Sequence, residues 1–281
     1  MNSKSGRRRS KWIVPAILYS ILAVTALAVL YPVLWIVSSA LTPGNALSSS
    51  VWPRRATMRH FTELLNETQF LLWFKNTLFI ATMTMLLSTV LIFLAAYSFS
   101  RFRFPGRRKG LMAMLVLQMF PNFMGMIAIY VLLLHVGLLD SHWGLILVYA
   151  GGSIPFGVWL VKGYFDGLPR SLEEAAKIDG ASHSLIFFRI ILPLSVPIVT
   201  FIAISHFIAP WMDFIFARLV IRSTDKTTVA IGLYNMITGR QNTQFASFAA
   251  GAVLISVPIT ILFLFLQRFI VDGLAAGANK G

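Results

Sequence analysis

The sequence predicts an all-α integral membrane protein with six transmembrane helices. Hydrophobic residues make up 57% of its 281 residues and charged residues only 12%, about half the charged share of a soluble domain. The mean hydropathy is +0.76. Six stretches are also apolar over the ~20 residues that a helix needs to cross the hydrocarbon core of a bilayer.

The predicted spans lie near residues 12–39, 71–99, 111–136, 142–164, 190–218 and 247–271. The first follows the basic segment MNSKSGRRRSKW, but it is too long for the apolar region of a signal peptide and lacks a small-residue cleavage site. We therefore expect a retained helix. The fourth contains Gly151, Gly152 and Pro155, and we expect a break there, which neighbouring helices can tolerate by satisfying the freed backbone groups.

The distribution of Lys and Arg predicts that both termini are cytoplasmic. The two densest basic clusters are residues 1–11 and the loop RFRFPGRRKG at 101–110, and basic loops prefer the cytoplasmic side. We expect a basic cytoplasmic N-terminus over 1–11, a transmembrane domain over 12–271 and a cytoplasmic tail over 272–281. The net charge of +14 is then explained by loops lying against anionic lipid, and we expect no nucleic-acid binding.

Two long segments fall on the opposite, outer side. They cover residues 42–70 and 219–246, and the second is expected to form a short helix around Val229–Ile237. Neither segment is large enough for a catalytic domain.

The inner segment between the fourth and fifth spans reads GLPRSLEEAAKIDGASHSLIFFRIILPLSVP. Ser171 followed by Glu174 is a capping-box pattern, and Gly180 suits a C-terminal stop in the left-handed conformation. These signals predict a helix over about 171–181 that lies along the inner face. A second helix is expected to start near Ser182, and prolines kink its continuation into the fifth span.

The composition of the first of these helices leaves two interpretations open. Its small alanines and flanking charges describe a plug for a groove in a partner protein. An interfacial helix resting on lipid headgroups is the alternative, although such a helix should carry larger apolar residues.

The run Glu174-Ala175-Ala176, then Gly180, then Ile190, Leu192 and Pro193 matches the E-A-A, x3, G, x9, I-x-L-P signature of ABC importer permeases. The chain resembles this family, which implies the type I importer permease fold. The resemblance also implies that the helix docks into a cleft of an ATP-binding subunit and transmits its nucleotide-driven closure. The candidate coupling residues are Glu173, Glu174, Ala175, Ala176, Lys177, Asp179, Gly180 and Ala181.

Further pieces resemble the carbohydrate branch of the family, the permeases for maltose and maltodextrin. They are Ala95–Gly106, Trp211–Phe214 and Asp272–Gly281. The resemblance implies import of maltodextrin-type oligosaccharides, with galacto-oligosaccharides, other disaccharides or glycerol phosphate as alternatives. It also implies contact of residues 235–242 with a binding protein, and of the tail with the ATPase through Gly277, Asn279, Lys280 and Gly281.

The same resemblance implies a set of partners in the cell membrane. They are a second homologous permease in a heterodimer, two copies of an ATP-binding subunit, and an extracytoplasmic solute-binding protein. The sequence itself contains no G-x-x-x-x-G-K-[ST] phosphate loop, so ATP and Mg are expected on the partner ATPase and no cofactor on this chain.

No catalytic or metal-binding residue is predicted. There is no Cys, and the five histidines, His60, His135, His142, His183 and His206, form no ligand pattern. A self-sufficient secondary transporter would need intramembrane ionisable relays or matched broken helices in two halves, and a membrane enzyme would need clustered acid and base residues. We therefore expect a non-catalytic permease subunit.

Sugar requires hydrogen-bond partners and aromatic faces along its path. Asn122, Trp211 and Asp213 are the candidates, since polar groups inside spans usually face a protein interior or a water path. Ordinary interhelical hydrogen bonding is the alternative for each of them.

Overall fold

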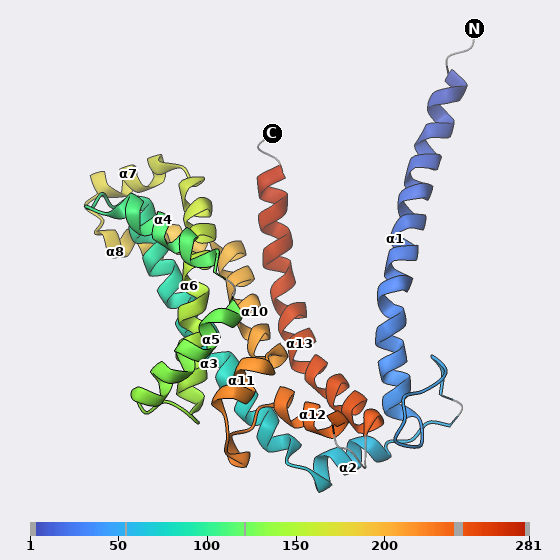
Figure 1. The fold of residues 1–281 in the computed structure, drawn as a ribbon. Coiled ribbons are helices and arrows are strands. Elements are labelled where there is room, and N and C mark those ends of the chain that lie inside the picture. Colours follow the sequence, from blue (N-terminus) through green and yellow to red (C-terminus); the bar gives the residue numbers. More distant parts are fainter. Residues whose placement is uncertain (1–3, 54, 121, 239–243, 279–281) are drawn as a thin grey trace. The chain divides into compact units, whose positions relative to one another are not determined.

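The computed structural model describes residues 4–53, 55–120, 122–238 and 244–278. The described chain is built from helices and their connecting segments, and Figure 1 shows their course. The long helices are α1 (Lys4–Leu41), α3 (Phe70–Arg101), α6 (His142–Asp166), α10 (Val196–Met212) and α13 (Phe245–Ala278). The shorter elements are α2 (Arg59–Glu67), α4 (Arg107–Gln118), α5 (Asn122–His135), α7 (Arg170–Ile178), α8 (His183–Ile186), the π-helical turn η1 (Phe187–Ile191), α9 (Leu192–Leu194), α11 (Ile215–Val220), the 3-10 turn η2 (Thr224–Lys226) and α12 (Val229–Thr238).

The predicted membrane spans correspond to four continuous helices and two bent pairs. The continuous spans are Val14–Leu41, Phe70–Arg101, His142–Asp166 and Phe245–Phe269, each long and apolar enough to cross a bilayer. The bent pairs are Arg107–Gln118 with Phe123–His135, and His183–Leu194 with Val196–Met212, with bends of 107° and 79°. The predicted all-α membrane fold is therefore confirmed.

One of the two predicted breaks is wrong and the other is confirmed. Helix α6 runs unbroken through Gly151, Gly152 and Pro155, whereas the kink expected at the entry to the fifth span is present. The bend in the third span was not predicted. In the fifth span two prolines, Pro193 and Pro197, stand four residues apart and neither can donate a backbone hydrogen bond. The chain turns at Ser195, whose hydroxyl donates to the carbonyl of Ile191 at 2.7 Å.

The chain forms two compact units. One contains residues 1–69 and 235–254, and the other contains residues 70–234 and 255–281. In the first unit, the segment after α1 is held by polar contacts. Trp35 Nε1 donates to the carbonyl of Ser48 at 2.9 Å, and His60 Nε2 lies 3.0 Å from the carbonyl oxygen of Thr42. The apolar side chains of α1 are largely exposed, as expected for a helix surrounded by lipid.

In the second unit, α3, α6 and α10 pack against one another. Helices α3 and α6 approach closely at Gly157, where a Cβ atom would lie 2.4 Å from Ile92 Cδ1. Figure 1 shows α7 and α8 at one end of α3 and α6, and α11 at the other end. The residues that carry the sequence signature therefore gather at a single end of this unit.

At the opposite end of the second unit, the segment around η2 is attached to α3 by hydrogen bonds. Asn76 Nδ2 donates to the carbonyls of Asp225 and Thr227 at 2.9 and 3.0 Å. The predicted short helix is confirmed as α12. Of the 235–242 zone expected to contact a binding protein, residues 239–242 lie outside the described residues.

Candidate functional site

Helix α7 begins earlier than predicted. Its N-cap is Pro169, at φ −60° and ψ 120°, with no side-chain capping bond. The capping box of Ser171 and Glu174 is therefore wrong, because the helix begins at Arg170 and Ser171 lies inside its first turn. Glu174 is left exposed instead of folded back on its own helix.

The C-terminus of α7 ends as predicted. Gly180 has φ +83°, its N–H donates to the carbonyl of Lys177 at 3.0 Å, and the N–H of Ala181 donates to the carbonyl of Ala176 at 2.9 Å. This pair of bonds is the Schellman motif. It places α8 directly after α7, and α8 is capped by Ser182, whose hydroxyl accepts from the N–H of Leu185.

One face of α7 is exposed. Glu174, Ala175, Lys177 and Asp179 are exposed, and the apolar side chain of Ile178 is 87% exposed. Beside this face lies an open cavity of about 630 Å³ lined by Ala176, Asp179, Gly180, Ala181, Leu185, Ile186, Arg189 and Ile190. A protruding apolar residue next to a hollow is a surface suited to a partner protein.

Glu173 faces the opposite way and is buried. Its Oε1 lies 2.6 Å from Arg101 Nε, and the two side chains are 6% and 5% exposed. Arg101 also donates to the carbonyl of Phe165 at 2.8 Å and to Ser100 Oγ, which itself donates to Asp166 Oδ1 at 2.6 Å. These bonds attach α7 to the ends of α3 and α6.

Sequence reasoning grouped Glu173 with the residues that face a partner, and it missed Arg101, Ser100 and Asp166. The sequence feature that could have predicted this network is Arg101, a single charge at the end of a long apolar helix. Such a charge needs an acidic or carbonyl partner when it is buried.

An aromatic cluster supports α8. The rings of Tyr97 and Phe187 lie 4.9 Å apart, and those of Phe102 and His183 lie 5.0 Å apart. Tyr97 Oη donates to the carbonyl of His183 at 3.4 Å. Both short helices are thus fastened to the membrane-spanning helices rather than carried on a loose loop.

A second candidate site is a cavity of about 440 Å³ between α3, α5, α6 and α10. Its lining residues are Thr84, Met126, Ile129, Val148, Tyr149, Gly152, Ser153, Ser205, His206, Ala209, Asp213 and Phe216. The carboxylate of Asp213 accepts from Tyr149 Oη at 2.5 Å and from the N–H groups of Phe216 and Ala217 at 3.2 and 3.1 Å. Within the described part of the chain, Thr84 Oγ1 is buried without a hydrogen-bond partner, so this hydroxyl is available to a polar group of a bound molecule.

Only one of the three predicted path residues is seen to line this cavity. Asp213 lines it, whereas Trp211 is 2% exposed and packs edge-on against Phe74 with ring centroids 5.2 Å apart. Asn122 begins α5, and its side chain lies outside the described residues.

The predicted tail contacts lie at or beyond the end of the described chain. Gly277 is in the last turn of α13, and Asn279, Lys280 and Gly281 lie outside the described residues. Among the described residues, no group of three or more His, Asp and Glu could hold a metal ion.

Residues 88–275 match the family described as the binding-protein-dependent transport system inner membrane component. The chain belongs to this family. It is a multi-pass inner-membrane protein and the non-catalytic permease subunit of an ABC importer, as the sequence predicted.

The curated relatives are sugar permeases. The chain is 42% identical to the galactooligosaccharides transport system permease protein GanQ of Bacillus subtilis, over 94% of both chains. It is 42% identical to the maltodextrin transport system permease protein MdxG of the same organism, over 100% of both. It is 36% identical to the maltose/maltodextrin permease MalG of Escherichia coli, over 90% of this chain and 92% of MalG.

A solved structure shares both fold and sequence with the chain. A bacterial ABC transporter involved in the import of the acidic polysaccharide alginate has a TM-score of 0.78 and 25% identity, over 95% of this chain and 98% of that one. A second structure, of an alginate transporter with a pentasaccharide-bound periplasmic protein, has a TM-score of 0.69 over 95% and 96%. At 17% identity it supports the fold alone.

Proposed function

We propose that this permease imports maltodextrin-type oligosaccharides as one half of a heterodimer with a second, homologous permease. Two copies of an ATP-binding subunit hold ATP and Mg, and a solute-binding protein delivers the sugar from outside. In this proposal both termini and α7 are cytoplasmic, and the tail from Gly277 to Gly281 reaches the ATPase. Similarity to MdxG along the entire chain supports the substrate class.

The observation that carries the mechanism is the two-sided character of α7. Its exposed face offers Glu174 and Ile178 to a partner. Its buried face is tied through Glu173 to Arg101. A helix that is exposed on one side and anchored on the other can transmit a displacement caused by the ATPase to α3 and α6, as alternating access requires.

The proposed docking surface can be tested by co-purification of the ATP-binding subunit with the assembled permease. Glu174→Lys and Gly180→Pro are expected to abolish binding. Ile178→Asp is expected to weaken binding about tenfold, because docking would then bury a charge in place of an apolar side chain. Ser184→Asp places the same charge on exposed α8 and should leave binding unchanged. Normal assembly and sugar uptake in Glu174→Lys would contradict the proposal.

Galacto-oligosaccharides are the second candidate substrate, because GanQ is as similar in identity as MdxG. Glycerol phosphate is disfavoured by the cavity around Asp213, whose described lining contains a carboxylate and neither Lys nor Arg. A phosphate there would lack its usual cationic partners. Uptake of labelled maltotriose against labelled galactobiose, by proteoliposomes carrying the complete transporter and its binding protein, decides between the two sugars.

A further inference from the structure

A basic cavity lies where α3 ends and α4 begins, beside the last turns of α6. Its volume is about 840 Å³, and it is lined by Phe104, Gly106, Arg107, Arg108, Lys109, Leu111, Met112 and Lys162. Four of these eight residues are basic and none is acidic. Neither the docking face of α7 nor the cavity around Asp213 uses them.

The walls of this cavity are fixed by contacts within the second unit. Arg107 Nε donates to the carbonyl of Phe99 at 2.7 Å, which ties the start of α4 to the end of α3. Trp159 Nε1 donates to the carbonyl of Leu111 at 2.9 Å, which ties α4 to α6. The rings of Phe99 and Phe104 lie 5.4 Å apart. The cavity is therefore preformed rather than a gap in a loose loop.

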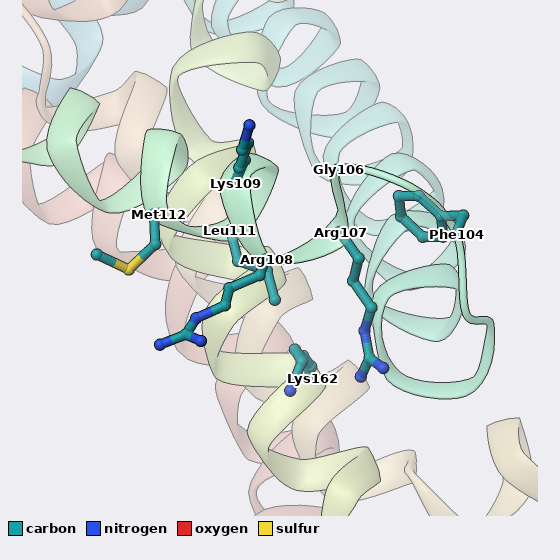
Figure 2. Close-up of a pocket in the computed structure, with 8 residues that line it drawn as sticks. All are labelled: Phe104, Gly106, Arg107, Arg108, Lys109, Leu111, Met112 and Lys162. Atoms are coloured by element: carbon teal, nitrogen blue, oxygen red, sulfur yellow. The ribbon is translucent and has the colours of Figure 1, made fainter.

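Most of the positive charge in the cavity is uncompensated. The guanidinium of Arg107 is bonded to backbone carbonyls, which leave its charge in place. Among the described residues, Lys162 is the one basic residue of this cavity with an acidic partner, Asp166. Within the described chain neither Arg108 nor Lys109 has a polar partner, and Figure 2 shows Arg108 and Lys162 extending on the side of α4 opposite to Lys109.

The position of these cations at the start of a helix adds to the charge. The first turn of α4 contains no acidic residue, so its three basic side chains face the positive end of the helix macrodipole. An anion bound in the cavity would relieve this repulsion.

The remaining lining is apolar and continues along α4. Phe104 is 40% exposed and Met112 is 53% exposed, and further along the helix Val116 is 50% exposed and Met119 is 81% exposed. Because α4 belongs to a bent pair of helices that is apolar enough to enter a bilayer, we expect this stripe to run from the basic cavity into the lipid. The surface thus matches a molecule with an anionic head and a long apolar tail.

We propose that the cavity binds an anionic phospholipid such as phosphatidylglycerol. Its phosphodiester accepts charge-assisted hydrogen bonds from Arg108 and Lys162, and one acyl chain lies along the exposed stripe of α4. Basic pockets between transmembrane helices at the membrane surface suit anionic headgroups in this way. A lipid held there would brace the junction of α3, α4 and α6, close to the anchor of α7.

Native mass spectrometry of the detergent-purified, assembled transporter tests the site directly. Titration with phosphatidylglycerol is expected to give a retained lipid, whereas phosphatidylcholine with the same acyl chains is not retained. Arg108→Gln should lower the affinity about fivefold, the fold-change that corresponds to ~1 kcal/mol per basic residue at a membrane surface. Arg108→Lys should keep most of the affinity.

Arg103→Gln is the matched control, since Arg103 is exposed on the same loop and does not line the cavity. An equal loss in Arg103→Gln would overturn the proposal in favour of diffuse surface charge. Equal retention of phosphatidylcholine, or binding of inorganic phosphate as tight as that of the lipid, would also overturn it. Lipid binding by the free chain that disappears on assembly would show that a protein partner covers the site instead. Arg108 is exposed, so an unchanged unfolding temperature should accompany each variant.

Discussion

Arg101 and Glu173 form a buried ion pair that joins the end of α3 to the first turn of α7. The atoms in contact are 2.6 Å apart. Burying two charges is costly unless the remaining hydrogen-bonding groups are satisfied. Here the other guanidinium donors reach Phe165 and Ser100, so the pair is embedded in a network. Displacement of α7 is therefore expected to move α3 and α6 with it.

Arg101→Met should destabilise the permease strongly. The substitution leaves the Glu173 carboxylate buried without a partner, and breaking a buried pair from one side costs ~3–5 kcal/mol. The expected result is a large fall in the unfolding temperature of the purified transporter, measured by intrinsic fluorescence. Sugar-stimulated ATP hydrolysis should be lost with it.

The double variant Arg101→Met with Glu173→Met separates stability from transmission. Replacing both charges by apolar side chains of similar length is often close to neutral for stability, so folding should recover to within about 1 kcal/mol of the original. If the pair transmits motion, sugar imported per ATP hydrolysed should stay low in this variant. Full recovery of that ratio would mean that the ion pair only stabilises the fold.

Gly180→Ala tests the left-handed end of α7. No atom of the described residues lies within 4 Å of where a Cβ at Gly180 would be, so the cost comes from its φ of +83° alone, roughly 1–2 kcal/mol for a non-glycine residue. We expect weaker binding of the ATP-binding subunit, by about tenfold, as the turn into α8 shifts. Gly163→Ala in α6 is the control, because its Cβ would also meet open space in a helical backbone where Ala is preferred. Equal effects of the two substitutions would contradict the argument.

The membrane-spanning helices could be predicted from sequence because the bilayer imposes a length and a composition on each of them. The ends of short helices could also be predicted where a single residue determines where the helix starts or stops, as at Gly180 and Ser182. The break expected in the fourth span was wrong and the kink at the entry to the fifth was right, because a proline bends a helix only when its surroundings allow it. Pro155 is held inside α6, which packs on α3 and α10, whereas Pro193 and Pro197 act together.

The candidate site was predictable only in part, for a similar reason. The exposed face of α7 carries a local motif, and sequence spacing is enough to find it. The buried face depends on Arg101, which lies 72 residues from Glu173 in the chain. No local pattern links the two residues, so their pairing emerges only when α3 and α6 are packed side by side.

Filling the cavity around Asp213 should block sugar passage if the cavity is part of the path. Gly152 lines this cavity and Gly151 does not, yet a Cβ at either position would meet no atom of the described chain within 4 Å. Gly152→Leu is expected to lower uptake of labelled maltotriose about tenfold or more, the scale on which a few carbon atoms alter a pocket's selectivity. Gly151→Leu should leave uptake unchanged. Similar uptake by both variants would remove the cavity from the proposed path.

At the other end of the second unit, the side chain of Asp140 joins the loop before α6 to the loop after α11. The stability that this contact adds should depend on pH. The Asp140 carboxylate accepts from the N–H groups of Arg222 and Ser223 at 2.9 and 3.0 Å and lies 3.4 Å from Lys226 Nζ. Partial burial alone would raise the pKa of Asp140, but these hydrogen bonds, the Ser223 hydroxyl and Lys226 outweigh it and hold the pKa below its usual value. A depressed carboxyl pKa stabilises the fold above the unfolded value of ~3.9, and the stabilisation is lost as pH falls toward the folded value.

Asp140→Asn should therefore unfold about 1 kcal/mol more easily at neutral pH, and its difference from the original protein should shrink below about pH 4. Asp225→Asn, on the partner loop that carries Arg222 and Ser223 and with an exposed side chain, is the control and should show no such change. A difference for Asp140→Asn that stays constant down to pH 3 would rule out this contact.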